Sequence, residues 1–309
     1  MTIAICFLTS EGVVLGADST ATYPADASGD TFVHLDHQQK VLEVGESSTI
    51  GLVHWGYMGF STKSLRTMTA ELGDRVKKQK LSTARTSVAE VARTWASMVD
   101  AEYRTHVIDK HAPKINRLHD LHKEAKRRLI EKPIGARLVD TEQAELARLQ
   151  SFVEGLRLGF FIGGYTEADR TPRAFEIRCD PERGVLEPVE FPELGHRIGG
   201  ETSIAERIHT GIDPSLGRLL NQLAVGAELQ PEVKRKLAAA KFSFGIPPIR
   251  ESIDFVHSVI HATIRAIKFS GHPQTCGGPI EIAVITSDRN FRWVRHKSFD
   301  SAINDGVGP

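Results

Sequence analysis

The fold is decided by residues 2–19, which read TIAICFLTSEGVVLGADS. Two apolar runs, Ile3–Leu8 and Gly12–Ala17, are separated by the polar residues 9–11. A short polar break between two apolar runs is typical of a β-hairpin. The start of the chain therefore predicts a pair of antiparallel strands over residues 3–18.

Strand and helix patterns alternate along the rest of the chain. A second apolar pair, 40–44 and 49–53, follows a long polar connection over residues 20–39. Apolar residues at helical spacing predict helices near 88–99, 141–154, 213–223 and 253–267, with Pro113 expected to break the helical pattern. Further strands are expected at 156–164, 173–177, 280–286 and 291–295. This order of elements predicts two packed sheets with helical layers outside.

The composition fits a globular chain without a global charge. Its 309 residues are 40% hydrophobic and carry 39 basic against 39 acidic side chains, which gives no reason to expect nucleic acid or an anionic membrane. Cys6, Cys179 and Cys276 are odd in number and lack metal-like spacing, so we expect reduced thiols. The N-terminus lacks a secretory signal, and no run of about 18 apolar residues occurs, so a cytoplasmic protein without a membrane span is expected.

Thr2 is a candidate nucleophile. A threonine hydroxyl attacks a carbonyl only when a base takes its proton. Removal of Met1 would give Thr2 a free α-amino group, whose ordinary pKa of about 7.7–8 makes it a base near neutral pH. One residue would then supply both nucleophile and base, although many chains begin with Met-Thr for no catalytic reason.

Two neighbouring segments strengthen the case for Thr2. Residues 12–19 read GVVLGADS, and residues 40–44 read KVLEV. Both resemble segments of proteasome β subunits and their bacterial relatives, in which a nucleophilic threonine opens the first strand. The spacing from Thr2 to Asp18 matches that family without a gap, and Lys40 matches its strand-opening lysine. The connection between Asp18 and Lys40 is longer than usual and is expected to lie over the active-site cleft.

The resemblance implies a role for each of these residues. Asp18 would lie beside Thr2 and orient Lys40 and the chain terminus, and Lys40 would lower the pKa of the Thr2 hydroxyl. The alternatives are a turn residue that caps the strand end for Asp18 and an exposed lysine at a strand edge for Lys40.

A glycine-rich turn of the family supplies N–H groups to the oxyanion. Residues 51–59 take its place here, and Gly56 is the expected donor. His54 and Trp55 align equally well. His54 is either an acid/base or a residue that lines the cleft.

Two outer positions of the family's site are altered. Residues 197–203 resemble a segment in which a serine supports the α-amino group, and Gly200 replaces that serine. We count Gly200 with the substrate-binding residues. Pro273 and Cys276 stand near the positions of an aspartate and a serine.

Three other signals are interpreted as structural. His257 and His261 have a helical spacing that could bind a metal, but no zincin pattern accompanies them. Cys276 is interpreted as a structural cysteine rather than a nucleophile. The basic stretch 104–132 lacks aromatic interleaving, so it is taken as a solvated helix face or a subunit contact. No metal and no cofactor are expected.

The sequence thus predicts an α+β fold, a four-layer αββα sandwich of the N-terminal nucleophile hydrolase type. Residues 1–309 would form a single domain, with an extended helical insertion at about 100–150. The expected function is hydrolysis of amide or peptide bonds by Thr2. The alternatives are a catalytically inactive scaffold of the same fold, a transpeptidase or ligase, and an amidase for small amides.

The expected partners follow from the same resemblance. They are a peptide or protein substrate and further copies of the chain, assembled as a ring or a helical stack. An ATPase unfoldase stays open as a partner, because no docking element for one is recognisable. Neither nucleic acid nor a membrane is expected to bind.

Overall fold

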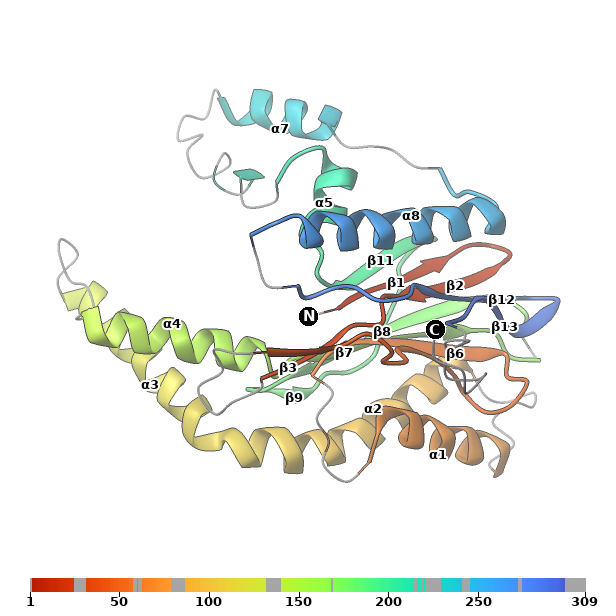
Figure 1. The fold of residues 1–309 in the computed structure, drawn as a ribbon, viewed down its shortest axis with the longest axis horizontal. Helices are drawn as coiled ribbons and strands as arrows, with labels where there is room; N and C mark the ends of the chain where they lie inside the picture. The colour runs from red at the N-terminus through yellow and green to blue at the C-terminus, as the bar shows by residue number, and fades with distance from the viewer. Residues whose placement is uncertain are drawn as a thin grey trace, which may run out of the picture.

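A computed structural model places most of the chain (Figure 1). It describes residues 2–24, 32–57, 60, 63–78, 87–131, 140–167, 169–213, 216–217, 219, 229–240, 245–271 and 274–297. Within these residues the structure combines helices with antiparallel sheets, so the predicted α+β class is confirmed. Pro273 and most of the helix expected at 213–223 lie outside the described residues.

The predicted N-terminal hairpin is the centre of the first sheet. Within the described ranges this sheet has five strands, in the order β11 (Gly195–Gly200), β1 (Ile3–Leu8), β2 (Gly12–Ala17), β12 (Glu281–Thr286) and β13 (Arg289–Arg295). Neighbouring strands run antiparallel. The register places Ile3 opposite Gly200 and Ala17 opposite Glu281, so four distant segments meet at one end of β1 and β2.

The second sheet contains the strand that follows Lys40. Its described strands run in the order β10 (Val189–Glu190), β8 (Arg173–Asp180), β7 (Leu158–Gly164), β6 (Ile50–Gly56) and β5 (Val41–Glu43), and β9 (Gly184–Val185) pairs with β8. The strands predicted at 40–44, 49–53, 156–164 and 173–177 are therefore confirmed, with shifts of a few residues at their ends.

Helices cover the outer faces of both sheets (Figure 1). The described helices are α1 (Leu65–Lys78), α2 (Val88–Tyr103), the π-helix η1 (Arg104–Asp109), α3 (Lys110–Glu131), α4 (Asp140–Glu154), α5 (Ser203–Thr210), α7 (Leu229–Ala240) and α8 (Ile249–Lys268). Helix α8 packs on β1 and β2, and α1 and α2 pack on the second sheet. None of the helices that the structure describes is long and apolar enough to cross a membrane.

Successive side chains of the buried strands pack into the cores on the two opposite faces of each sheet. Ile5 on β1 belongs to the core under α8, together with Val256, whereas the next residue, Cys6, belongs to the core between the sheets. On β7, Phe160 faces the α1–α2 side and Phe161 faces the first sheet. Successive side chains of a strand point to opposite faces, so apolar runs such as IAICFL suit strands that are buried on both faces.

The connection over residues 20–39 contains structure that its polar sequence did not predict. Strands β3 (Ala21–Pro24) and β4 (Phe32–Leu35) form a two-stranded antiparallel sheet. Alternation of polar and apolar residues over only four positions is too short to stand out from a loop. Asp36, just after β4, accepts a hydrogen bond from the Thr20 hydroxyl at 2.6 Å, which ties the connection to the end of β2.

The expected helix break at Pro113 does not occur, because Pro113 lies inside α3. A proline has no N–H to donate, and its ring would clash with the carbonyl four residues earlier, here that of Asp109. The π-helix η1 ends at Asp109, so a wider turn of helix is located at this point. The local change of helical repeat explains how the chain continues through the proline.

Helices α3 and α4 form a pair that extends beyond the sheets (Figure 1). Their contact contains a small apolar core that includes Leu118 and Leu149. The Arg117 guanidinium donates two hydrogen bonds to the Glu145 carboxylate, at 2.9 and 2.7 Å. Much of the basic stretch 104–132 therefore lies on a helix that packs against a partner helix of the same chain.

Candidate functional site

Thr2 lies at the start of β1, beside Gly200. Its carbonyl accepts the Glu201 N–H at 2.7 Å, which continues the pairing between β1 and β11. Only 2% of Thr2 is exposed. Met1 precedes Thr2 in this chain, so the Thr2 nitrogen is an amide and becomes an amine only when Met1 is removed.

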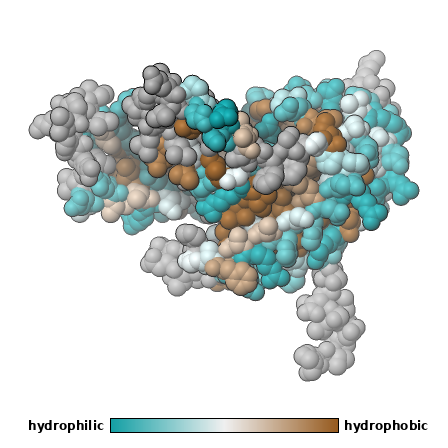
Figure 2. Space-filling model, turned by 90° about the horizontal axis from the view of Figure 1, so that it is seen from above, coloured by the Kyte–Doolittle hydropathy of each residue, from teal (hydrophilic) through white to brown (hydrophobic). Residues whose placement is uncertain are grey.

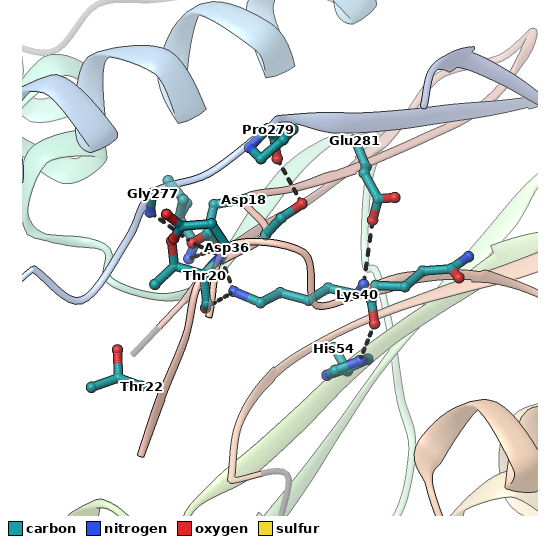
Figure 3. A network of polar contacts seen from close by, with 12 residues as sticks. Asp18, Thr20, Thr22, Asp36, Lys40, His54, Gly277, Pro279 and Glu281 are labelled. Atoms are coloured by element: carbon teal, nitrogen blue, oxygen red, sulfur yellow. Dashed lines mark hydrogen bonds and ion pairs between the residues drawn. The ribbon is translucent and has the colours of Figure 1, made fainter. Parts of the chain in front are cut away.

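Asp18 lies directly after β2, where the hairpin register brings it beside the start of β1 (Figure 3). Its carboxylate accepts the Ile3 N–H at 3.1 Å, the Thr20 N–H at 3.2 Å and the Gly277 N–H at 3.0 Å. The Lys40 ammonium donates to the same carboxylate at 2.8 Å. Asp18 is fully buried, and these four donors replace the water that its charge would otherwise require.

Lys40 lies just before β5 and is also fully buried. Its ammonium donates to Asp18 and, at 2.6 Å, to the Thr20 carbonyl (Figure 3). Its backbone N–H points toward the Glu281 carboxylate, with a nitrogen-to-oxygen distance of 3.4 Å. The structure thus brings Asp18 and Lys40 together as a buried ion pair next to the residue that follows Thr2.

His54 lies on β6 behind Lys40. Its backbone N–H donates to the Lys40 carbonyl at 3.1 Å, and its Nε2 lies 3.3 Å from the Gln39 carbonyl. Burial, with a further contribution from the Lys40 charge, lowers the pKa of His54 to about 3. The imidazole is therefore neutral at pH 7, donates from Nε2, and is a weak base. This geometry suits a residue that holds the Lys40 segment rather than one that exchanges protons.

Acid should destabilise the fold partly through His54. In the unfolded chain its pKa returns to 6.5, so between pH 6.5 and about 3 the unfolded state binds one more proton. Stability that is present above pH 6.5 is therefore lost as the pH falls. From pH 7 to 5 the loss is about 2 kcal/mol for this group. His54→Gln keeps an N–H donor without this titration and should lose correspondingly less in urea unfolding at the two pH values. Equal losses would show that His54 does not titrate in this way.

Gly56 and Gly200 lie in different surroundings. Gly56, with φ +93°, pairs with Leu158, and a Cβ on it would lie 2.2 Å from the Arg157 carbonyl oxygen. Gly200, with φ +83°, lies against Thr2, and an added Cβ would lie 1.7 Å from the Thr2 carbonyl oxygen. Trp55, which precedes Gly56 on β6, lies close to Gly200. A Cβ added to Gly200 would be 3.4 Å from the Cβ of Trp55.

Gly200→Ala should destabilise the fold by about 2–4 kcal/mol, because strain at positive φ adds to a clash with the Thr2 carbonyl. Gly195→Ala is the matched control on the same strand. Gly195 also has a positive φ, +137°, but an added Cβ meets nothing within 4 Å. The control should lose about 1–2 kcal/mol, from strain alone. Urea unfolding measures both, and equal losses would remove the packing explanation for glycine at position 200.

The site contains partners that the sequence analysis did not identify. They are the Thr20 carbonyl, the Gly277 N–H and the Glu281 carboxylate. Glu281 is fully buried at the start of β12, and a charged residue at the start of an apolar strand is a signal that could have singled it out. The Thr20 carbonyl and the Gly277 N–H are backbone groups, so the residue types at these positions do not indicate their roles.

The cysteine and histidines discounted above have structural surroundings. Burial, with additions from the charges of Asp18 and Glu201, raises the pKa of the Cys276 thiol to about 12, so it stays protonated at neutral pH. Nε2 of His257 lies 2.8 Å from an Arg295 nitrogen, and Nε2 of His261 accepts from Arg265 at 3.3 Å. The Nε2 lone pair of each imidazole is thus directed at a guanidinium group rather than toward a shared metal position.

Comparison with known proteins gives no family assignment. No protein-family model matches the chain, and no curated protein matches it. Its structure is similar to solved structures of Anbu (ancestral beta-subunit). The protein from Yersinia bercovieri has a TM-score of 0.43 and 10% identity, over 96% of this chain and 88% of that chain. A Gly-1 mutant from Hyphomicrobium sp. strain MC1 has a TM-score of 0.42 and 14% identity, over 99% and 94%.

These comparisons correct the assignment to proteasome β subunits. The neighbours named above are Anbu structures at 10% and 14% identity, and they do not place the chain among proteasome β subunits. The assignment was wrong because it depended on two short segments, residues 12–19 and 40–44. Such segments describe a local hairpin with a carboxylate and an amine, and they do not fix a family.

Proposed function

We propose that this chain is an N-terminal threonine hydrolase that cleaves amide bonds after removal of Met1. The observation that carries the proposal is the position of Asp18. One buried carboxylate binds both the Lys40 ammonium, at 2.8 Å, and the N–H of the residue after Thr2, at 3.1 Å. We further propose that the packing of α8, the two sheets and α1–α2 is a four-layer αββα sandwich in a single domain.

The reaction would use groups that the chain supplies itself. The α-amine of Thr2 takes the hydroxyl proton, and Oγ1 attacks the carbonyl carbon of the amide. The tetrahedral intermediate collapses, the C–N bond breaks, and the leaving amine takes the proton from the α-ammonium. Water then attacks the ester, releases the carboxylic acid and restores the Thr2 hydroxyl. Backbone N–H groups near Gly56, at the end of β6, would stabilise the oxyanion.

Lys40 would act through its charge in this scheme. Its ammonium is held by Asp18 and the Thr20 carbonyl, so it is a fixed positive charge close to the start of β1. A positive charge in a buried site favours the ionised form of a nearby hydroxyl and lowers its pKa. Asp18 holds the ammonium itself, and Glu281 and His54 contact the backbone of Lys40.

The proposal is tested at the N-terminus of the purified protein. Intact-mass spectrometry should show that Met1 is absent, and a β-lactone probe should acylate Thr2 and add its full mass to the N-terminal peptide. A chain that retains Met1, or a label on another residue, would reject the proposal. A peptide ester offered with and without an added amine then distinguishes hydrolysis from transfer to the amine.

A second candidate function is an inactive scaffold, and burial of the site favours it. Thr2 is 2% exposed, and Asp18 and Lys40 are fully buried. A substrate carbonyl needs access to Oγ1, which a residue that is 2% exposed does not give. Loss of Met1 without any acylation by the β-lactone would support the scaffold over the hydrolase.

Self-association is part of the proposal. Apolar residues form a band on the face seen in Figure 2, with hydrophilic residues around it. Exposed apolar side chains near α5 and α8 include Ile208, Leu216, Ile246 and Phe269, of which Phe269 is 79% exposed. An apolar band of this kind on an exposed face commonly marks an interface. We propose that peptides or proteins are the substrates and that copies of the chain associate; light scattering would give the mass of the assembly.

A further inference from the structure

A groove of about 1110 Å³ runs along α1, and Thr2 is not among the residues that line it. Its helical wall includes Arg66, Ala70, Asp74 and Lys77, which recur at the three- and four-residue spacing of one helix face. The opposite wall comes from the ends of β5 and β13. We call this space the α1 groove. Its volume lies just above the range of about 300–1,000 Å³ that is typical of small-ligand sites, and nothing in the proposed reaction uses it.

One end of the α1 groove is cationic. Arg66, His296 and Lys297 line it, and Arg66 has no ion pair with any carboxylate among the described residues. Lys297 is 12% exposed, and its ammonium lies 3.3 Å from Glu281. Burial lowers the pKa of Lys297, and the charges of Lys40 and Arg66 add to that effect. Lys297 and the His296 imidazole lie 3.3 and 3.5 Å from the same buried Glu281 carboxylate, whereas Arg66 has no such partner in the described part of the chain, which leaves its charge for an anion.

The other end of the α1 groove is acidic. Glu43, Glu46 and Asp74 line it, against the single ammonium of Lys77. Burial raises the pKa of Glu43, and the charge of Glu46 adds to the rise. Two like charges that disfavour each other are stabilised by a cation placed between them. This end is therefore complementary to an amine.

The distance between the cationic and acidic ends of the α1 groove determines how long a ligand can be and still reach both ends. Arg66 and Lys77 are eleven residues apart on α1, which corresponds to about 16 Å along the helix axis. An extended peptide covers at most about 3.3–3.6 Å for each residue, so four or five residues fit. Leu42 and Trp293 provide apolar contacts between the charged ends.

We propose that the α1 groove binds a short peptide with free termini. The C-terminal carboxylate of the peptide contacts Arg66 and Lys297, and its amine lies near Glu43 and Glu46. Free peptides of this kind are the products of the proposed amide hydrolysis, but the binding site itself does not depend on that reaction. A bound carboxylate would compete with Glu281 for Lys297, and Glu281 also faces the Lys40 N–H.

Calorimetric titration of the full-length chain tests this site. The probe is the tetrapeptide Ala-Leu-Ala-Leu with both termini free, and the comparison peptides are its C-terminal amide and its N-acetyl form. The protein carries Thr2→Ala, so that hydrolysis cannot obscure binding. Each blocked peptide should bind about tenfold more weakly, because each lacks one charge contact.

Variants of the α1 groove decide where the peptide lies. Arg66→Gln should weaken the free peptide about tenfold and remove its advantage over the amide, and Glu46→Gln should remove its advantage over the acetylated form. Arg75→Gln is the control, because Arg75 is exposed on the same helix and does not line the groove. The proposal fails if the three peptides bind equally, or if Arg66→Gln behaves like the control. If these titrations show binding and the β-lactone fails to acylate Thr2 in the natural chain, the groove stands and the hydrolase alone is rejected.

Discussion

Lys40→Met should destabilise the fold by about 3–5 kcal/mol, the range for removing one partner of a buried ion pair. Methionine fills similar space but leaves the Asp18 carboxylate without its cation. Asp18 is fully buried, so water cannot replace the lost contact. The Thr20 carbonyl would also lose its donor. Urea unfolding at pH 7 measures the change, with the slope of the transition checked against the natural chain.

Two further variants show whether the loss comes from an unpaired charge. Lys63→Met removes a lysine whose pair with Glu71 is 40% and 38% exposed, and exposed pairs contribute only about 0–1 kcal/mol. Asp18→Asn combined with Lys40→Met removes both charges and should recover part of the stability lost in the single variant. If Lys40→Met cost no more than Lys63→Met, the buried pair would not stabilise this fold.

The residues around this pair make Lys40 a fixed group. Its ammonium is bound on one side, its backbone N–H faces Glu281, and its carbonyl accepts the His54 N–H. A flexible lysine normally loses several rotatable bonds when it is ordered. Here residues on or next to β2, β6 and β12 together keep Lys40 ordered. A site with such support is suited to chemistry that needs a charge at a set position.

Much of the fold could be predicted because the buried strands have simple patterns. The runs at 3–8 and 12–17 are apolar throughout. The residues 9–11 between them have the length of a hairpin turn. The helix stripe at 253–267 marks α8 for the same reason, since one apolar face packs on a sheet. The strands β3 and β4 were missed because runs of four residues, ATYP and FVHL, are too short to carry a periodic signal. The passage of α3 through Pro113 was missed because a π-helical turn has no sequence rule.

The candidate site was predictable only where side chains carry it. Asp18 and Lys40 were found because their segments resemble those of proteasome β subunits, and the structure brings the two side chains within 2.8 Å. Gly277 and the Thr20 carbonyl were not found, since a backbone donor or acceptor exists at nearly every residue. Their selection depends on how residues 18–20 meet residues 275–279 in space. Gly200 was noted as a missing serine, and the structure adds that a side chain there would clash with Thr2.

Thr2→Ala should abolish acylation by the β-lactone and reduce amide hydrolysis by at least about a thousandfold, the scale expected when a nucleophile is removed. Thr2→Val is the stricter version, because it keeps the branched shape of the buried side chain and removes only the hydroxyl. Thr2→Ser keeps the hydroxyl and should retain measurable acylation. Acylation rates are measured by intact mass, and each variant is first shown to lack Met1.

These variants also separate chemistry from stability. Thr2 is 2% exposed at the edge of the core, so loss of its hydroxyl could weaken the fold as well as the reaction. Thr2→Val should unfold at nearly the same urea concentration as the natural chain while it loses acylation. Full activity in Thr2→Ala would show that another group attacks the carbonyl, and Asp18 and Lys40 would then be a structural ion pair. Loss of activity with unchanged stability would assign the reaction to the hydroxyl of Thr2, because the variant differs from the natural chain in that group alone.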